Sequence, residues 1–500
     1  MKYFRDIHFG YKTIHIGFLL LGVFAAALVF IFFDFGIEKE NTELMAAIAV
    51  LVSVWWITEA IPLSATALVP LVLFPTLGIL SGEATASAYV NSTIFLFMGG
   101  FIIAIAMEKW NLHKRIALNL ISLFGTNPSR IILGFMIAAA FISMWISNTA
   151  TAVMLLPIGL AILYKIEDEF GKKKTKTFSI SLMLGIAYAC SIGGIATLIG
   201  TPPNLVFQRV YSITFPNEPQ ILFGQWMIYG VPLSFVMLII AWFIITKIIY
   251  PTKKDIAIDV NVIREERKKL GKMSYEEKTV LIVFILTAVL WIFRKKIEIG
   301  SFVLPGWSDL LPVPNFIDDG TVAITMGLIL FIIPTRSEKT EESAILDIGA
   351  FRKIPWEIIL LFGGGFALAD GFVKTGLSDF IGSKFQGLAG VHPMIIILAI
   401  CLTITFLTEL TSNTATSQIV LPILAALAVE LKIEPMLLMI PATISASMAF
   451  MMPVATPPNA IVFGSERLKV HQMAKSGFWL NIIGAMLITL FSYFLIDTIF

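Results

Sequence analysis

The stretch SNTAT occurs twice in this chain, at residues 147–151 and at residues 412–416, and each copy is followed at the same spacing by Leu-Pro-Ile. We name the first three residues of each copy the first SNT segment (residues 147–149) and the second SNT segment (residues 412–414). Both interrupt long apolar runs. Such runs lie in lipid, where unpaired polar groups are costly. Each SNT segment must therefore face a cavity, another helix or a ligand.

The composition of the whole chain is that of a membrane protein. Of its 500 residues, 57% are hydrophobic and only 14% are charged. Many apolar stretches reach about 18 residues, enough to cross a bilayer as a helix, and the weak alternation of a membrane β-barrel is absent. We predict an all-α polytopic membrane protein, multi-pass in the cell membrane. The net charge of +2 implies no nucleic-acid partner.

The N-terminal residues suggest how the chain is oriented. Residues 1–12 are short, polar and net basic, and residues 14–33 form the first candidate span. The span is long for a signal peptide and more membrane segments follow it. Because basic segments favour the inner side of the membrane, we expect a cytoplasmic N-terminus.

Three features repeat in the same order along the two halves of the chain. The sequence GGF at residues 99–101 recurs 265 positions later, as do the SNT segments, and TPPN at residues 201–204 recurs 255 positions later, at 456–459. We name the last pair the first and second TPPN segments. This agreement indicates a duplication, with halves at residues 1–249 and 278–500. Residues 250–277 are charged, and we interpret them as a solvated linker.

Paired interruptions in matching positions of two halves are typical of secondary transporters. We expect broken helices at residues 147–149 and 412–414. We expect re-entrant hairpins at about residues 91–124 and 356–386, broken by their glycine pairs. We expect about 11 transmembrane segments in all. We count an odd number of crossings in each repeated unit, which would make the two repeats inverted.

The residue types at the interruptions favour an anion site. Ser, Asn and Thr are strong N-cap residues, and Pro fits the first position of a helix, so each SNT and TPPN segment can begin a half-helix whose free N–H groups attract anions. No Lys, Arg or His lies in residues 140–160, 190–207, 405–425 or 445–463. Carbonyl groups and the side chains of Asn148 and Asn413 could bind Na⁺, which suggests two cation sites.

Two alternative interpretations remain open from the residues alone. Ser, Thr and Asn often only link helices in membranes by hydrogen bonds worth about 0.6 kcal/mol. Glu409 could likewise be a structural partner of backbone or basic groups, or take part in coupling.

At these residues the chain resembles the divalent anion/sodium symporter family, which transports di- and tricarboxylates and, in some members, sulfate. The matching motifs are WWITEAIP at 55–62, both SNTAT stretches, GTPPN at 200–204 and ATPPN at 455–459. The resemblance implies a homodimer. In each protomer a scaffold domain and a transport domain, both assembled from the two halves, would work as an elevator.

The resemblance also implies specific ligands. The substrate ligands would be Ser147, Asn148, Thr149, Thr201, Pro202, Ser412, Asn413, Thr414, Thr456 and Pro457. The first cation site would use Ser143, Ser147, Asn148 and Gly200, and the second would use Thr408, Thr411, Asn413 and Ala455.

We therefore expect a secondary carrier of C4 and C5 dicarboxylates, namely succinate, malate, fumarate or 2-oxoglutarate, with citrate as a further candidate. Both Na⁺-coupled symport and Na⁺-independent exchange fit the motifs. A carrier of sulfate or another inorganic anion, and an anion channel, are the alternatives. No catalytic motif is present, so we expect no enzyme, and no cofactor apart from Na⁺ as coupling ion.

Overall fold

The computed structural model describes residues 2–33, 41–252, 261–299, 302–337, 342–388 and 390–500. Its first half is helical throughout. The helices are α1 (Lys2–Phe32), α2 (Thr42–Thr58), α3 (Leu63–Thr66), α4 (Val69–Thr76), α5 (Gly82–Ser87), α6 (Ser92–Lys109), α7 (Leu112–Ser122), α8 (Pro128–Ser143), α9 (Asn148–Phe170), α10 (Lys172–Gly194), α11 (Pro202–Thr214), α12 (Phe223–Phe243) and its π-helical continuation η1 (Ile244–Ile249).

The second half is also mostly helical, and it contains two short antiparallel strands, β1 (Ile297–Ile299) and β2 (Phe302–Leu304). Its helices are α13 (Asn261–Lys269), α14 (Tyr275–Ile292), α15 (Asp319–Ile332), α16 (Gly349–Lys353), α17 (Trp356–Thr375), α18 (Leu377–Ser383), α19 (Pro393–Leu407), α20 (Asn413–Leu431), α21 (Met436–Ala446), α22 (Pro457–Phe463) and α23 (Val470–Ile499). Short 3₁₀ turns are η2 (Trp307–Leu310), η3 (Pro314–Phe316) and η4 (Gln386–Leu388).

The lengths of the helices confirm a polytopic membrane protein. Within the described residues, eight helices are long and apolar enough to cross a bilayer, and six further apolar helices have 10–17 residues. Apolar helices of that shorter class suit the arms of hairpins and of interrupted spans, which need not cross alone.

The glycine pairs do not break their helices, so that prediction was wrong. Helix α6 runs without interruption through Gly99 and Gly100, and α17 does so through Gly364. A Cβ added to Gly99 would lie 2.5 Å from the backbone of Ala323 in α15, and one added to Gly364 would lie 2.6 Å from the carbonyl oxygen of Ala67. These glycines allow close contact between helices, as small residues commonly do in membranes.

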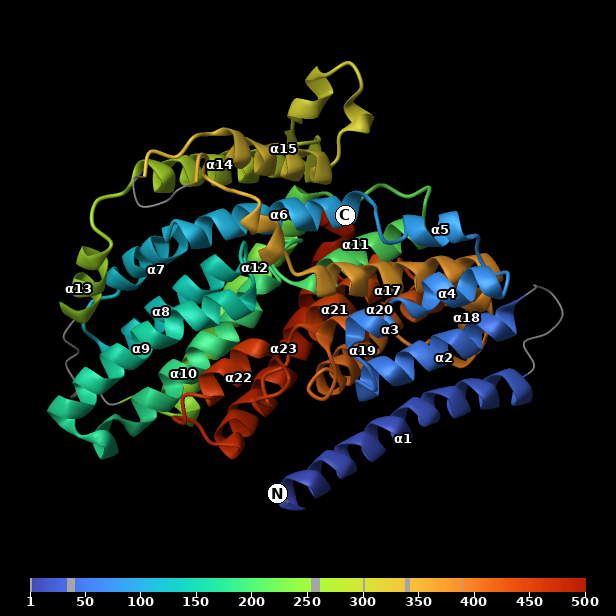
Figure 1. The fold of residues 1–500 in the computed structure, drawn as a ribbon, viewed down its shortest axis with the longest axis horizontal. Coiled ribbons are helices and arrows are strands. Elements are labelled where there is room, and N and C mark those ends of the chain that lie inside the picture. Colours follow the sequence, from blue (N-terminus) through green and yellow to red (C-terminus); the bar gives the residue numbers. More distant parts are fainter. Residues whose placement is uncertain (1, 34–40, 253–260, 300–301, 338–341, 389) are drawn as a thin grey trace.

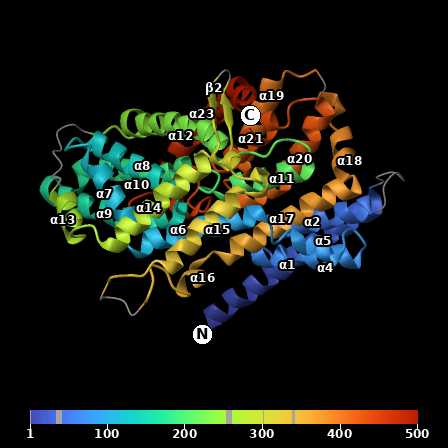
Figure 2. The same ribbon diagram turned by 90° about the horizontal axis from the view of Figure 1, so that it is seen from above.

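The two antiparallel hairpins form instead around the SNT segments. The first consists of α8 and α9, joined through residues 144–147, and the second consists of α19 and α20, joined through residues 408–412. In both ribbon views the first lies left of the centre, in teal, and the second lies right of the centre, in orange, with other helices beyond it (Figures 1 and 2). Hairpins on opposite sides of the centre agree with inverted repeats.

The halves also exchange packing partners at the centre of the molecule. Helix α11, from the first half, packs against α20, α21 and α17 of the second. Helix α22, from the second half, packs against α9 and α10 of the first. Each TPPN segment therefore begins a helix that lies among elements of the other half.

The charged linker is not simply solvated, which corrects our interpretation. Residues 253–260 lie outside the described part, but α13 packs against α7 and α9, and Ile263 is buried. Arg115 binds the Glu277 carboxylate through two nitrogens, at 2.8 and 2.9 Å. Lys114 and Glu266 form a second ion pair, at 3.1 Å. The linker is thus fixed across the end of the first hairpin.

The close contact at Gly99 makes a prediction about stability. We expect Gly99→Ala to destabilise the protein by about 2–3 kcal/mol, because the new methyl group meets the backbone of α15 rather than a movable side chain. The adjacent Gly100→Ala is the control, since its nearest neighbour is the Ile199 methyl group at 3.4 Å. Melting temperatures in detergent should fall for the first variant only. Equal melting temperatures would contradict this account of α6.

Candidate functional site

The first SNT segment ends one half-helix and begins another, as predicted. The hydroxyl oxygen of Ser147 accepts a hydrogen bond from the backbone N–H of Ala150 at 3.1 Å, which caps α9. Asn148 is the first residue of that helix, and its side-chain oxygen accepts a hydrogen bond from the hydroxyl of Ser143 at the end of α8. A serine of the preceding helix is thus linked to the SNT amide.

The second SNT segment repeats the arrangement. Ser412 caps α20 by accepting from the N–H of Ala415 at 3.5 Å, a weaker cap than the first. The hydroxyl oxygen of Thr408, which stands where the first half has Ser143, lies 2.6 Å from the Asn413 side-chain oxygen. The hydroxyl of Thr411 lies 2.7 Å from that of Thr416. In both halves a hydroxyl of the preceding segment therefore bonds to the SNT asparagine.

The TPPN segments begin helices α11 and α22 with Pro at the first position. This is the position where proline's missing N–H is not needed. Thr456 caps α22 by accepting from the N–H of Asn459 at 3.4 Å. Thr201 makes no such bond, and its hydroxyl lies 3.5 Å from that of Ser447 instead.

The last residue of each TPPN segment is a structural residue that sequence reasoning missed. The Asn204 amide donates to the carbonyl oxygens of Gly194 and Thr197, at 3.2 and 2.7 Å. The Asn459 amide donates to those of Ala449 and Met452, at 3.1 and 3.0 Å. Both side chains are fully buried, and neither Oδ1 atom has a hydrogen-bond partner in the described part of the chain. Their repetition in both halves was the available signal.

Two oxygen atoms lie close to Gly194, beside the first SNT segment. A Cβ added to Gly194 would lie 3.0 Å from the side-chain oxygen of Asn148, 3.1 Å from the carbonyl oxygen of Gly200 and 3.2 Å from the side-chain nitrogen of Asn148. A methyl group at this position would therefore crowd both oxygens. Carbonyl and amide oxygens at an unwound helix end are ligands for Na⁺, so the residues predicted for the first cation site fit that ion.

A similar cluster lies at the second SNT segment. The hydroxyl oxygen of Thr408 is 2.6 Å from the Asn413 oxygen and 2.9 Å from the carbonyl oxygen of Ala446. One hydroxyl has one proton, so it can donate to only one of the two acceptors at a time. The oxygens of Thr408, Asn413 and Ala446 thus lie together with a single hydrogen among them. A small cation bound there would give all three oxygens a positively charged partner.

A series of intermediate residues connects the two SNT segments. In the first half Asn148 and Gly200 both lie close to Gly194, Gly200 precedes Thr201 in the chain, and the Thr201 hydroxyl lies 3.5 Å from that of Ser447. Ser447 follows Ala446, whose carbonyl oxygen accepts the Thr408 hydrogen bond. The segments therefore lie on one connected set of residues, rather than at separate surfaces.

The predicted site residues differ in their exposure. Ser147, Asn148, Ser412 and Asn413 are half-buried, which leaves polar atoms for a ligand. The exposure of the remaining predicted residues differs between some corresponding positions of the two halves. The exposed ones are Thr149 and Pro457, and the half-buried ones are Pro202, Thr411 and Ala455. The buried ones are Ser143, Gly200, Thr201, Thr408, Thr414 and Thr456.

A cavity of about 510 Å³ extends along α9 to Ala150, the residue that follows the first SNT segment. One wall is helix α9, from Ala150 to Ala161, and the other is the turn between α6 and α7. His113 and the Lys114–Glu266 ion pair lie at its edge. Burial lowers the pKa of His113, while hydrogen bonds from Lys269 and Lys114 lower the pKa of Glu266.

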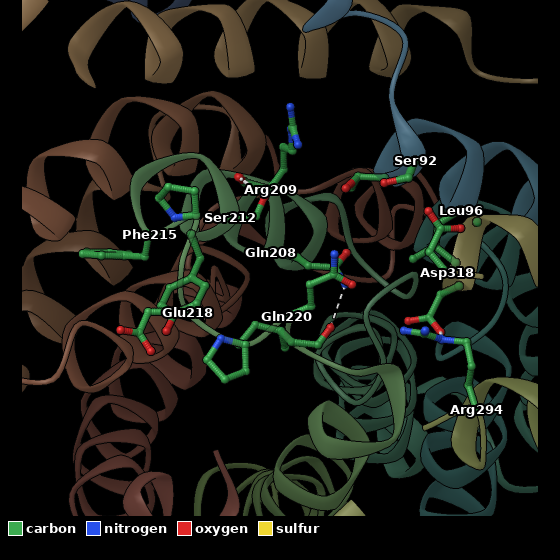
Figure 3. A pocket seen from close by; sticks show the side chains of 17 residues that line it. Ser92, Leu96, Gln208, Arg209, Ser212, Phe215, Glu218, Gln220, Arg294 and Asp318 are labelled. Atoms are coloured by element: carbon green, nitrogen blue, oxygen red, sulfur yellow. Dashed lines mark hydrogen bonds and ion pairs between the residues drawn. The ribbon is translucent and has the colours of Figure 1, made fainter. Parts of the chain in front are cut away.

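A second polar cavity, of about 240 Å³, lies between α11 and the first turns of α6 and α15 (Figure 3). Two arginines line it together with three carboxylates, those of Glu218, Asp318 and Asp319. The Nε atom of Arg209 has no hydrogen-bond partner in the described part of the chain. The guanidinium of Arg294 lies 2.5 Å from the Asp319 carboxylate and also donates to the Ile317 carbonyl. The side chain of Arg209 is directed away from Gln208 and Arg294 (Figure 3). This cavity is therefore a poorer anion site than the SNT segments.

Comparison with known proteins agrees with this geometry. Residues 12–496 match the profile of the family described as the sodium:sulfate symporter transmembrane region. The sodium-dependent dicarboxylate transporter SdcS of Staphylococcus saprophyticus is 43% identical over 487 residues, which are 96% of this chain and 91% of that protein. SdcS of Staphylococcus aureus strain MRSA252 is 43% identical over 486 residues, with the same coverage.

Two solved structures share the fold. MtrF of Neisseria gonorrhoeae has a TM-score of 0.56 at 14% identity, covering 96% of this chain and 94% of its own. YdaH of Alcanivorax borkumensis has a TM-score of 0.57 at 14% identity, covering 90% of this chain and 98% of its own. At this identity the likeness concerns the fold alone. The family profile and the two SdcS relatives span nearly the whole chain, and the chain therefore belongs to the sodium:sulfate, or divalent anion/sodium, symporter family that its duplicated motifs predicted.

Proposed function

We propose that this chain is a secondary transporter that carries C4 and C5 dicarboxylates, such as succinate, malate, fumarate and 2-oxoglutarate, across the cell membrane together with Na⁺. The observation that carries the proposal is the connection of two SNT segments, each at a helix start, in a region that contains no Lys, Arg or His. Relatives named as sodium-dependent dicarboxylate transporters support the same substrate class and ion. The protein is a transporter rather than an enzyme.

A dicarboxylate suits this arrangement because it has an anionic group at each end. One carboxylate binds the hydroxyl, amide and free N–H groups of the first SNT segment at the start of α9, and the other binds those of the second at the start of α20. Thr201, Pro202, Thr456 and Pro457 line the same space. Sulfate, the alternative substrate, has a single compact centre and would leave one segment without a ligand.

Coupling to Na⁺ follows from the missing positive charge. A dianion that enters a region of low dielectric needs compensation, and no fixed cationic side chain provides it. The oxygen clusters around Asn148 and Asn413 bind the coupling ions beside the substrate. This favours symport over exchange, because cation and anion then cross the membrane together.

Movement of the substrate requires access from both sides in turn. We infer that both hairpins, with α10–α12 and α21–α23, form a transport domain that moves as an elevator against a scaffold of α1–α7 and α14–α18. A homodimer would hold the scaffolds fixed. The 510 Å³ cavity lies on the side of the basic α9–α10 connection and of α13, which the positive-inside rule makes cytoplasmic, together with the N-terminus.

Transport by purified protein in proteoliposomes tests the proposal. We expect an inward Na⁺ gradient to drive accumulation of radiolabelled succinate, and we expect internal unlabelled succinate to accelerate entry by counterflow. Replacing Na⁺ with choline should reduce uptake to background. Uptake that needs internal dicarboxylate but not Na⁺ would indicate exchange, uptake without counterflow would indicate a channel, and transport of sulfate alone would contradict the assigned substrate.

A further inference from the structure

A buried carboxylate lies next to the second cation site. Glu409 follows Thr408 directly in the chain, and only 4% of its surface is exposed. Its oxygens accept hydrogen bonds from four donors, which are the backbone N–H groups of Phe450, Met451 and Met452, at 2.7, 2.8 and 2.9 Å, and the Asn481 amide, at 2.7 Å. The side chain thus binds the loop between α21 and α22 and attaches it to α23.

The donors of Glu409 are all neutral. Within the described residues no Lys, Arg or His forms an ion pair with it. N–H groups stabilise a carboxylate without neutralising it. Because the carboxyl group accepts four hydrogen bonds and donates none among the described residues, it is bound as the carboxylate. Its negative charge thus lies where an uncompensated charge is costly.

In the first half the corresponding loop is held by an uncharged side chain. Met144 stands in the position that Glu409 occupies in the second half, 265 residues later. Its carbonyl oxygen accepts from the Thr197 hydroxyl at 2.5 Å, and that hydroxyl accepts from the N–H of Gly200 at 3.1 Å. A neutral threonine thus holds the loop that precedes the first TPPN segment. The two otherwise similar halves differ here by one negative charge.

The loop that Glu409 holds includes a residue expected to bind the cation. Met452 donates its N–H to the carboxylate, and its carbonyl oxygen accepts from the N–H of Ala455 at 3.2 Å and from the Asn459 amide at 3.0 Å. By binding Met452, the Glu409 carboxylate holds the residues that precede the second TPPN segment. Glu409 is also the chain neighbour of Thr408, whose hydroxyl belongs to the oxygen cluster around Asn413.

We propose that Glu409 is a positioning residue for the second cation site. Its carboxylate holds the α21–α22 loop so that the loop oxygens face Asn413, and its charge makes this site bind Na⁺ more tightly than the first. The inference rests on the proposed Na⁺ coupling. It assigns unequal roles to two sites whose SNT motifs are identical, since Glu409 adjoins the second site while Met144 stands in its place at the first.

Binding of Na⁺ without substrate tests the inference directly. The melting temperature of the purified protein is measured as Na⁺ replaces choline at constant ionic strength. For Glu409→Gln we expect the Na⁺ concentration at half-maximal stabilisation to rise about fivefold, as loss of one charge interaction near the ion would cause. Glu409→Asp keeps the charge but is one methylene shorter, so its midpoint should lie between those of the wild type and Glu409→Gln.

The matched control is Glu276→Gln. The Glu276 carboxylate is equally buried and accepts from the N–H of Arg336 and the hydroxyl of Thr335, in the scaffold part of the chain. We expect this variant to lower the melting temperature without changing the Na⁺ midpoint. If Glu409 had a purely structural role, Glu409→Gln would also lower the melting temperature without changing the Na⁺ midpoint. That outcome would overturn the inference.

Two further outcomes are distinguishable. If Glu409→Gln cannot be purified, Glu409→Asp alone decides, and a midpoint equal to that of the wild type would overturn the inference. If the wild type shows no Na⁺-dependent stabilisation and its uptake does not depend on Na⁺, then the proposed coupling fails, and the assignment of Glu409 fails with it. If Na⁺ stabilises the wild type and the Na⁺ midpoint of Glu409→Gln equals that of the wild type, the inference about Glu409 is wrong, but the proposed coupling stands.

Discussion

Asn413→Ala is expected to reduce Na⁺-driven succinate uptake at least about a hundredfold. The change removes an amide that, in the proposed mechanism, binds both the substrate and the second cation, and loss of a hydrogen bond to a charged group costs about 1.5–3 kcal/mol. The side chain is half-buried and its partner, Thr408, retains the Ala446 carbonyl as acceptor, so the fold should persist. Uptake by proteoliposomes and elution on size-exclusion chromatography measure the two effects.

Asn148→Ala should behave in the same way, because the first SNT segment has the same geometry. The exposed Asn217→Ala, in the loop before α12, is the matched control and should transport like the wild type. If both SNT variants kept normal uptake, the SNT segments would only link helices, and the proposed site would be wrong.

Gly194→Ala is expected to impair the first cation site selectively. The added methyl group would lie 3.0 Å from the Asn148 side-chain oxygen and 3.1 Å from the Gly200 carbonyl oxygen. Contacts this short displace one of the two oxygens or exclude the ion. We expect the Na⁺ concentration for half-maximal uptake to rise more than about tenfold, equivalent to about 1.4 kcal/mol. The Hill coefficient for Na⁺ should fall from about two toward one.

Gly185→Ala, in the same helix, provides the control for Gly194→Ala. Its added Cβ would meet the side chain of Met136 at 3.1 Å, and a flexible methionine can move. Na⁺ dependence should therefore remain that of the wild type. An unchanged Hill coefficient and midpoint in Gly194→Ala would remove the first cation site from this position.

The parts of the site that the sequence predicted depend on local chemistry. Ser147 and Ser412 cap helices because their hydroxyl groups satisfy N–H groups a few residues away, and proline begins α11 and α22 for an equally local reason. The duplication then predicted that corresponding segments would come together. Both inferences need only spacing and residue type.

The errors arose where a residue's role depends on a distant partner. A glycine pair in an apolar helix has the same composition whether it breaks the helix or allows another helix to approach. Only the position of Ala323 beside Gly99 decides the matter. The hydrophilic α13 likewise gave no sign of packing on α7. Glu409 does bind backbone groups, which was one of the roles expected for it, but its sequence neighbours do not reveal that the donors lie at 450–452 and 481.

The position of a bound dicarboxylate tests the central claim most directly. An electron cryo-microscopy structure of the protein in lipid nanodiscs, with saturating succinate and Na⁺, would show it. We predict density for succinate within hydrogen-bonding distance of both Asn148 and Asn413, one carboxylate at each. Density in the cavity beside Arg209 and Arg294, or contact with only one SNT segment, would contradict the account.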